Sequence, residues 1–147
     1  MSREAVTRKI LAAKVEKGIR WGDVAVTLGL SRAWTVAACL GQMTLDDAQS
    51  RIVAGIFGLD EIDRAWLKTV PYKGSLPTAV PTDPLIYRFY ELVNVYGSTL
   101  KELIHEEFGD GIMSAIDFSM DLQRETDPKG DRVRIVMSGK FLPYKRY

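Results

Sequence analysis

The chain is poor in the residues from which many catalytic and metal sites are built: its 147 residues include one cysteine and one histidine. Cys39 alone cannot form an internal disulfide or a metal cluster of several cysteines, which favours a reducing compartment, so we expect the cytoplasm. His105 alone cannot supply a histidine-based metal site or more than one catalytic base. Their neighbours predict that Cys39 is an inert buried thiol and that His105 is a solvated residue on a charged helix.

Long apolar runs, a charge excess and phosphate-binding glycine motifs are also missing. No apolar run approaches the roughly 20 residues of a membrane-spanning helix, and the N-terminus lacks the apolar stretch of a signal peptide. We therefore expect the mature chain to be the whole chain and expect no membrane partner. Lys and Arg number 20 against 19 Asp and Glu, which leaves no overall field to hold a nucleic acid. The sequence has neither a Gly-x-x-x-x-Gly-Lys nor a Gly-x-Gly-x-x-Gly motif, so it gives no support for a nucleotide-binding site.

What the chain does have is the composition of a folded protein, with 46% hydrophobic and 27% charged residues. Residues 70–84 hold four of the prolines and little helical periodicity, which predicts a linker between two domains, 1–75 and 76–147. Each domain has about 70 residues, a size at which a single core is marginal, so we expect docking or oligomerisation.

Residues 1–75 carry the start and stop signals of five helices, with side chains that cap helix starts and glycines that follow helix ends. This domain is therefore expected to be all helical. The signals are Ser2 and Gly18 for the first helix, residues 21–28 for the second, Ser31 and Gly41 for the third, Thr44 with Asp47 and then Gly58 for the fourth, and Asp60 for the fifth.

The second and third of these helices have the pattern of a helix-turn-helix of the phage-repressor type, with Ala25 followed four residues later by the turn at 29–31. A helix that reads DNA should present several Arg, Lys, Asn or Gln side chains, whereas the helix after this turn has Arg32 alone. Thr35 also replaces the branched apolar residue usual in that motif. We therefore favour a structural helical domain, with a DNA-binding regulator as the alternative.

Residues 76–147 combine helix and strand signals. Asp83 and Pro84 predict a helix start, and Gly97–Ser98 predict a break or kink, after which Thr99 and Glu102 would cap a further helix that stops before residues 109–111. From Asp117 the apolar residues alternate, and the alternation returns at 133–137, which predicts a β-hairpin. The fold class is therefore α+β: an N-terminal helical bundle followed by a small helix and hairpin domain.

Three polar residues of the second domain are candidates for chemistry. Arg88 and Glu91 lie three apart, hence on one helix face, and Ser114 follows a glycine-rich turn. On spacing alone, the Arg88 and Glu91 pair is an exposed ion pair worth under about 0.5 kcal/mol, and Ser114 is a cap or fills a tight contact. No reaction follows from spacing alone.

Five segments form a more specific pattern: residues 84–91 (PLIYRFYE), 95–118 (VYGSTLKELIHEEFGDGIMSAIDF) and 139–143 (GKFLP), with 29–31 (GLS) and 37–42 (AACLGQ) in the first domain. Together they closely resemble the cyanate hydratase, or cyanase, family. The resemblance covers the whole chain. It implies a repressor-like N-terminal domain without an established DNA role, followed by a catalytic and dimerisation domain.

The resemblance implies a lyase that decomposes cyanate to ammonia and carbon dioxide. Bicarbonate attacks cyanate, the adduct loses carbon dioxide, and the remaining carbamate decomposes. The family's catalytic Arg, Glu and Ser fall on Arg88, Glu91 and Ser114. Physical chemistry agrees, because two anions react only where positive charge and hydrogen-bond donors hold them. We expect Glu91 to orient Arg88, with proton transfer as the alternative if burial raises its pKa, and backbone N–H groups of the turn before Ser114 to help.

The resemblance also implies a homo-oligomer, a decamer arranged as a pentamer of dimers, with active sites where several subunits meet. If sites are shared in this way, Arg88 and Ser114 of one site can come from the same chain or from different chains. The partners are cyanate and bicarbonate, with no nucleic acid or membrane, and no metal or organic cofactor is expected because bicarbonate is the nucleophile. Detoxification and use of cyanate as a nitrogen source both fit. An assembly module without catalysis is a further alternative, which an exposed Arg88 far from any pocket would favour.

Overall fold

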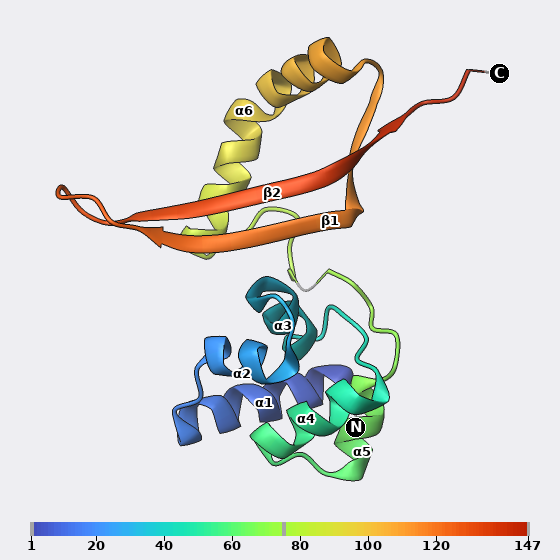
Figure 1. The fold of residues 1–147 in the computed structure, drawn as a ribbon, viewed down its shortest axis with the longest axis vertical. Helices are drawn as coiled ribbons and strands as arrows, with labels where there is room; N and C mark the ends of the chain where they lie inside the picture. The colour runs from blue at the N-terminus through green and yellow to red at the C-terminus, as the bar shows by residue number, and fades with distance from the viewer. Residues whose placement is uncertain (1, 75, 147) are drawn as a thin grey trace. The chain divides into compact units, whose positions relative to one another are not determined.

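The computed structural model describes residues 2–74 and 76–146, and the chain forms two compact units, Met1–Ser75 and Leu76–Tyr147 (Figure 1). We call them the N-terminal and C-terminal units. The α+β class is confirmed, because a helical unit precedes a unit of one helix and one hairpin. The elements are α1 (Arg3–Lys17), α2 (Trp21–Leu28), α3 (Arg32–Cys39), α4 (Asp47–Phe57), α5 (Glu61–Leu67), α6 (Pro84–Phe108), β1 (Gly111–Glu125) and β2 (Arg132–Pro143).

Most of the predicted helix ends in the N-terminal unit are confirmed. The Ser2 hydroxyl accepts from the Ala5 N–H at 3.3 Å, and the Ser31 hydroxyl accepts from the Trp34 N–H at 3.2 Å. Gly18 ends α1 in the left-handed region, at φ 62°, where a side chain would be strained. The third helix stops earlier than expected, at Cys39, and the chain turns at Gly41 with φ 86°.

The predicted start of α4 is wrong. Asp46 caps this helix in place of Thr44 with Asp47: its carboxylate accepts from the Gln49 N–H at 2.7 Å, and the Gln49 side chain accepts from the Asp46 N–H at 2.9 Å. This reciprocal pair of hydrogen bonds satisfies two backbone N–H donors, which explains why Asp46 is the cap of α4. Asp47 is then free to form ion pairs, with Arg51 at 2.7 Å and with Arg64 at 2.8 Å.

The predicted break in the helix of the C-terminal unit is also wrong. α6 continues for 25 residues across Gly97 and Ser98, although its ribbon bends part-way along (Figure 1). Thr99 and Glu102 therefore lie inside the helix and cap nothing. One glycine costs a helix only about 1 kcal/mol, which the turns on either side can offset.

The hairpin is longer than the alternation predicts, because β1 begins at Gly111 and not near Asp117. β1 pairs antiparallel with β2, and the register shifts between the pairs Met113 with Phe141 and Phe118 with Gly139. Between these pairs lie residues 114–117 of β1 but only Lys140 of β2. The extra residues form a bulge, a feature that bends a strand and re-aims its side chains.

The two units differ in how they bury apolar side chains. The N-terminal unit has a core contributed by all five of its helices and by the loop before α4. In the C-terminal unit, α6 has no buried residue, and the buried positions among its described residues are Pro81, Gly111 and Ser114. No helix in the described ranges has the length and hydropathy needed to cross a membrane. The N-terminal core consists of Val6, Ile10, Ala13, Val24, Ala38, Cys39, Leu45, Val53, Phe57 and Leu67.

Candidate active site

Arg88 and Glu91 are placed by the start of α6. The carboxylate of Asp83 accepts from the N–H groups of Leu85 at 3.0 Å and of Ile86 at 2.9 Å, and Pro84 occupies a first-turn position that needs no N–H. This cap fixes where the helix begins. Arg88 and Glu91 therefore lie on one face, one to two turns from its start.

The two side chains contact each other, as their spacing predicts. Arg88 Nη1 lies 3.4 Å from Glu91 Oε2, and the guanidinium carbon of Arg88 lies 6.0 Å from the centroid of the Tyr87 ring. Their side chains are 65% and 53% exposed in the single chain. At that exposure the pair adds at most about 1 kcal/mol to stability, so it orients Arg88 more than it holds the fold together.

Ser114 is buried, at 5% exposure, where the bulge of β1 begins. Its hydroxyl oxygen accepts hydrogen bonds from the N–H groups of Ile116 at 3.0 Å and of Asp117 at 2.9 Å. Because both lone pairs are engaged, the hydroxyl hydrogen is what this side chain still has to offer. The chemistry available to Ser114 is therefore donation of a hydrogen bond to an acceptor such as an anion.

The glycine-rich segment before Ser114 does not form the expected turn of anion-binding N–H groups. Gly111 belongs to β1 and pairs with Pro143 of β2, and the N–H groups that surround the Ser114 hydroxyl come from the residues after it. A Cβ on Gly111 would meet the Phe141 ring and the Leu142 carbonyl oxygen. The glycine is therefore explained by close strand packing, which leaves no side-chain space there.

Gly139 is a residue that the sequence analysis missed. A Cβ at this position would collide with the Ser114 carbonyl oxygen and would lie 2.7 Å from Cγ of Met113. The bulge therefore sits over a residue that must lack a side chain. A glycine inside an alternating strand is the signal that could have identified this close approach.

The structure brings Arg88 and Glu91 together but does not join Ser114 to them. No hydrogen bond or ion pair among residues 2–74 and 76–146 links Ser114 to either side chain. Beside the bulge is an open pocket of about 350 Å³ whose lining includes Asp117, Gly139 and Lys140. Arg88 is exposed, as the assembly-module alternative requires, but no residue of α6 is buried in the single chain, so the exposure is a property of the whole helix and does not favour that alternative over an enzyme.

The lone histidine is not solvated as predicted. His105 is partly buried, with Nε2 3.3 Å from the Gly111 carbonyl oxygen and Nδ1 3.3 Å from the Lys101 ammonium nitrogen. An ammonium group only donates, so Nδ1 accepts and Nε2 carries the hydrogen. His105 thus ties the end of α6 to the start of β1, where the Phe108 and Phe141 rings also stack at 5.3 Å.

The lone cysteine behaves as predicted. Cys39 has no exposed surface, and burial raises the pKa of its thiol to about 11 against the opposing effect of the Arg3 charge. A thiol with this pKa is protonated and unreactive at neutral pH. The described residues also contain no group of three or more His, Cys, Asp or Glu side chains that could hold a metal ion.

The presumed recognition helix α3 offers little to DNA. It buries Thr35, Ala38 and Cys39 against the bundle and has one basic residue, the exposed Arg32. The Thr35 hydroxyl is buried and has no hydrogen-bond partner in the described ranges, so threonine fills an apolar position of the motif. This helix has a packing role, as predicted.

Comparisons with known proteins match both units. The family model described as "Cyanate hydratase, N-terminal" matches residues 3–71, and that described as "Cyanate lyase C-terminal domain" matches residues 78–146. Proteins named cyanate hydratase from Variovorax paradoxus and Methylibium petroleiphilum are 70% and 71% identical over 147 residues, which is all of both chains. The crystal structure of a cyanase from T. urticae superposes with a TM-score of 0.82 at 37% identity, covering 94% of this chain and 96% of that one.

Proposed function

The chain belongs to the cyanate hydratase (cyanate lyase) family, and from this premise we propose that it decomposes cyanate with bicarbonate. The observation that carries the proposal is the identity of about 70% over the full length of relatives that bear the name cyanate hydratase. In the proposed reaction, cyanate, bicarbonate and two protons give one ammonia and two carbon dioxide molecules, with carbamate as the last intermediate. Bicarbonate is the nucleophile, so the reaction requires neither a metal nor an organic cofactor.

The central physical problem of this reaction is that both substrates are anions. Arg88 supplies fixed positive charge, and its side chain is 65% exposed in the single chain, so it is available to a site that forms between subunits. Ser114 supplies a donor whose direction is set by its two backbone hydrogen bonds. Holding both anions against these groups raises their effective concentration, which offsets much of the barrier.

Glu91 has the role of a positioning residue in this proposal. Its carboxylate lies against Arg88 at 3.4 Å and limits the orientations that the guanidinium adopts. In the single chain the Glu91 side chain is about half exposed, and its carboxylate contacts the Arg88 guanidinium. The orienting role is therefore preferred over proton transfer.

The proposed enzyme works as a homo-oligomer, a decamer built as a pentamer of dimers, with each site formed where subunits meet. The support for assembly is the surface of α6, which is rich in large apolar side chains that a single chain leaves in water. A two-stranded hairpin is likewise marginal without a partner sheet. Arg88 and Ser114 of one site then come from different chains. The apolar residues of α6 are Leu85, Ile86, Tyr87, Phe89, Tyr90, Leu92, Val93, Val95, Tyr96, Leu100, Leu103 and Phe108.

The remaining parts of the proposal concern the cell. The single buried cysteine fits a reducing compartment, and we place the enzyme in the cytoplasm. There it would remove cyanate as a toxic anion, or release its nitrogen as ammonia for biosynthesis. The proposal includes no nucleic-acid or membrane partner.

The test is ammonia release from cyanate by the purified protein, with and without bicarbonate in buffer depleted of carbon dioxide. Ammonia that forms only when bicarbonate is present is the expected result. Ammonia that forms equally without bicarbonate would contradict the proposed nucleophile. No ammonia from folded, assembled protein would contradict the proposed function as a whole.

A further inference from the structure

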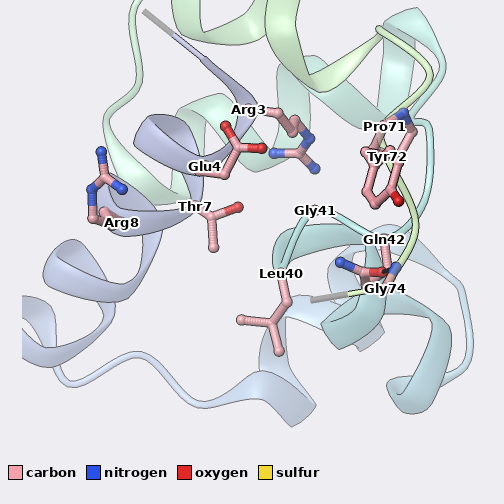
Figure 2. Close-up of a pocket in the computed structure, with 10 residues that line it drawn as sticks. All are labelled: Arg3, Glu4, Thr7, Arg8, Leu40, Gly41, Gln42, Pro71, Tyr72 and Gly74. Atoms are coloured by element: carbon pink, nitrogen blue, oxygen red, sulfur yellow. Dashed lines mark hydrogen bonds between the residues drawn. The ribbon is translucent and has the colours of Figure 1, made fainter. Parts of the chain in front are cut away.

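A second pocket lies entirely within the N-terminal unit, far from the proposed chemistry in sequence. It has a volume of about 390 Å³ and is bordered by the first turns of α1, by the turn after α3 and by the segment 71–74 (Figure 2). Its lining includes Gly41, where a Cβ would lie 3.1 Å from the Thr7 hydroxyl oxygen. The proposed reaction assigns no role to this pocket.

The unusual feature of the pocket is the guanidinium of Arg3, which is directed into it (Figure 2). Arg3 is only 6% exposed, and Nη2 donates to the Ala38 carbonyl oxygen at 2.5 Å. Nε and Nη1 are buried and have no hydrogen-bond partner among the residues that the structure describes. Buried charged donors without an acceptor are costly, so an acceptor in the pocket that the guanidinium reaches by a small movement would stabilise it.

Arg64, a partly buried arginine of the same unit, is by contrast paired with carboxylates. Arg64 also has a buried Nε without a partner, but its two terminal nitrogens lie 3.1 Å from Glu61 and 2.8 Å from Asp47. Arg3 has no carboxylate within ion-pair distance in the part of the chain that the structure describes. Burial accordingly lowers the pKa of Arg3, against the weaker opposing effects of Cys39 and Glu4.

The other lining residues define what kind of acceptor fits. Arg8 adds a second positive charge and Glu4 a negative one, which leaves one net positive charge to balance. Leu40, Pro71 and the ring of Tyr72 provide apolar lining. Charge therefore selects a monoanion, and the apolar lining favours one that carries an organic body over a bare inorganic ion.

We propose that this pocket binds a small organic monocarboxylate, whose carboxylate accepts from Arg3 and whose apolar body packs against Leu40 and Tyr72. A pocket of about 390 Å³ accommodates a molecule of the size of benzoate. This site is separate from the proposed cyanate chemistry, so the two proposals fail or succeed independently. The bound carboxylate would join the start of α1 to the segment that follows α5.

The probe is benzoate, observed by saturation-transfer NMR in the presence of the full-length chain. The chain carries Arg88→Ala, so that the arginine of the proposed active site does not capture the probe. We expect benzoate to receive saturation, and the neutral analogue benzamide to receive much less. Arg3→Gln should weaken binding by at least about tenfold, because a charge-assisted hydrogen bond is lost. Arg8→Gln should weaken it by about threefold, because Arg8 contributes mainly through its charge.

The matched control is Arg20→Gln, which removes the same charge from an exposed arginine outside the pocket lining. It should leave benzoate binding unchanged. Equal saturation of benzoate and benzamide, or binding that survives both Arg3→Gln and Arg8→Gln, would overturn the proposal. If the Arg3→Gln variant does not fold, two measurements still test the proposal: the binding of benzoate to the Arg8→Gln variant, in which the changed residue is exposed, and the comparison of benzoate with benzamide. Cyanate turnover is not a readout of this experiment.

Discussion

The two units differ in that one contains the apolar core and the other contains the candidate catalytic residues. The N-terminal unit has a core of ten residues, and each of its helices turns an apolar side toward it. The C-terminal unit holds Arg88, Glu91 and Ser114, yet α6 buries nothing and the hairpin is a single pair of strands. One unit therefore buries apolar side chains in its own core, whereas the unit proposed to carry the chemistry leaves the large apolar side chains of α6 uncovered in a single chain.

The largest expected difference between the two units is in catalysis, which we expect a substitution in the C-terminal unit to reduce. Arg88→Ala should lower kcat/KM for cyanate by about a thousandfold or more, because the positive charge that holds two anions is lost. Assembly and the unfolding of the N-terminal unit should not change, because the Arg88 side chain is 65% exposed. The measurements are ammonia release and sedimentation velocity. Arg124→Ala, which removes an exposed arginine near the hairpin end, is the control.

A variant that stays active, or one that no longer assembles, would count against the role of Arg88. In the first case the charge is not needed for the reaction. In the second case the loss of activity would report a structural role for the side chain and would leave its chemistry unproven.

The next largest effect concerns the second half of the proposed site. Ser114→Ala should lower kcat by about a hundredfold, the usual loss when one donor to an anion is removed. The variant also leaves two backbone N–H groups without their acceptor, so circular dichroism and thermal unfolding should be recorded alongside ammonia release. An unchanged kcat in a folded protein would remove Ser114 from the site.

A pair of leucine substitutions would test the contrast in stability. Leu67→Ala, at a position with no exposed surface in the N-terminal core, should lower the free energy of unfolding by about 2 to 5 kcal/mol. Leu92→Ala, at a position 48% exposed on α6, should instead weaken association, seen as smaller species in sedimentation velocity at low protein concentration. If Leu92→Ala left association intact and Leu67→Ala dispersed the assembly, the division between the units would be wrong.

The smallest of these effects lies in the ion pairs of the N-terminal unit. Asp63 is 2% exposed and its carboxylate accepts from the Lys9 ammonium at 2.7 and 2.8 Å. Asp63→Asn should lower the free energy of unfolding by about 1 to 3 kcal/mol, because a buried charge-assisted bond is lost. Denaturant titration at neutral pH measures this loss.

The same pair predicts the sign of an alkaline effect. The hydrogen bond to Asp63 raises the pKa of Lys9 above its ordinary value of 10.5. The stabilisation is therefore complete below pH 10.5 and is lost as the pH rises through the raised value. In Asp63→Asn this part of the alkaline dependence should disappear. An identical dependence in both proteins would show that Lys9 gains nothing from the pair.

Local signals predicted most of the helical unit because helix ends are decided by a few neighbouring residues. Ser2, Gly18 and Ser31 act where their positions indicate. The prediction of Thr44 as the cap of α4 was wrong because a second nearby side chain, that of Asp46, can also cap this helix. Asp46 is the cap because it forms reciprocal hydrogen bonds with Gln49. The free-energy difference between two neighbouring residues as helix cap is about 1 kcal/mol, and residue types alone do not show which of them caps the helix.

The hairpin was only half predicted, and the bulge explains why. Met113 and Phe118 lie opposite Phe141 and Gly139, residues two apart on β2, although they are five apart on β1. An odd spacing reverses the alternation of side chains, so the apolar pattern that begins at Phe118 does not extend back to Gly111. The beginning of β1 depends on pairing with a distant segment, which periodicity does not contain.

The candidate site was predicted unevenly for the same reason. The contact of Arg88 with Glu91 follows from helical spacing, so it could be predicted directly. The surroundings of Ser114 depend on the bulge and on the lack of a side chain at Gly139, 25 positions further along the chain. Ser114 is a candidate catalytic residue because of the resemblance to a family. Spacing alone predicts only that it fills a tight contact or caps a helix.

The hydrogen bonds of Ser114 also bear on how the protein could be inhibited. Reagents that acylate or phosphorylate serine hydrolases depend on an oxygen with a free lone pair and a nearby base. The lone pairs of the Ser114 oxygen accept from the N–H groups of Ile116 and Asp117, and no histidine among the described residues forms a hydrogen bond with it. Sulfonyl fluorides and organophosphates should therefore leave Ser114 unmodified, and an effective inhibitor would have to be a stable anion that accepts its hydrogen.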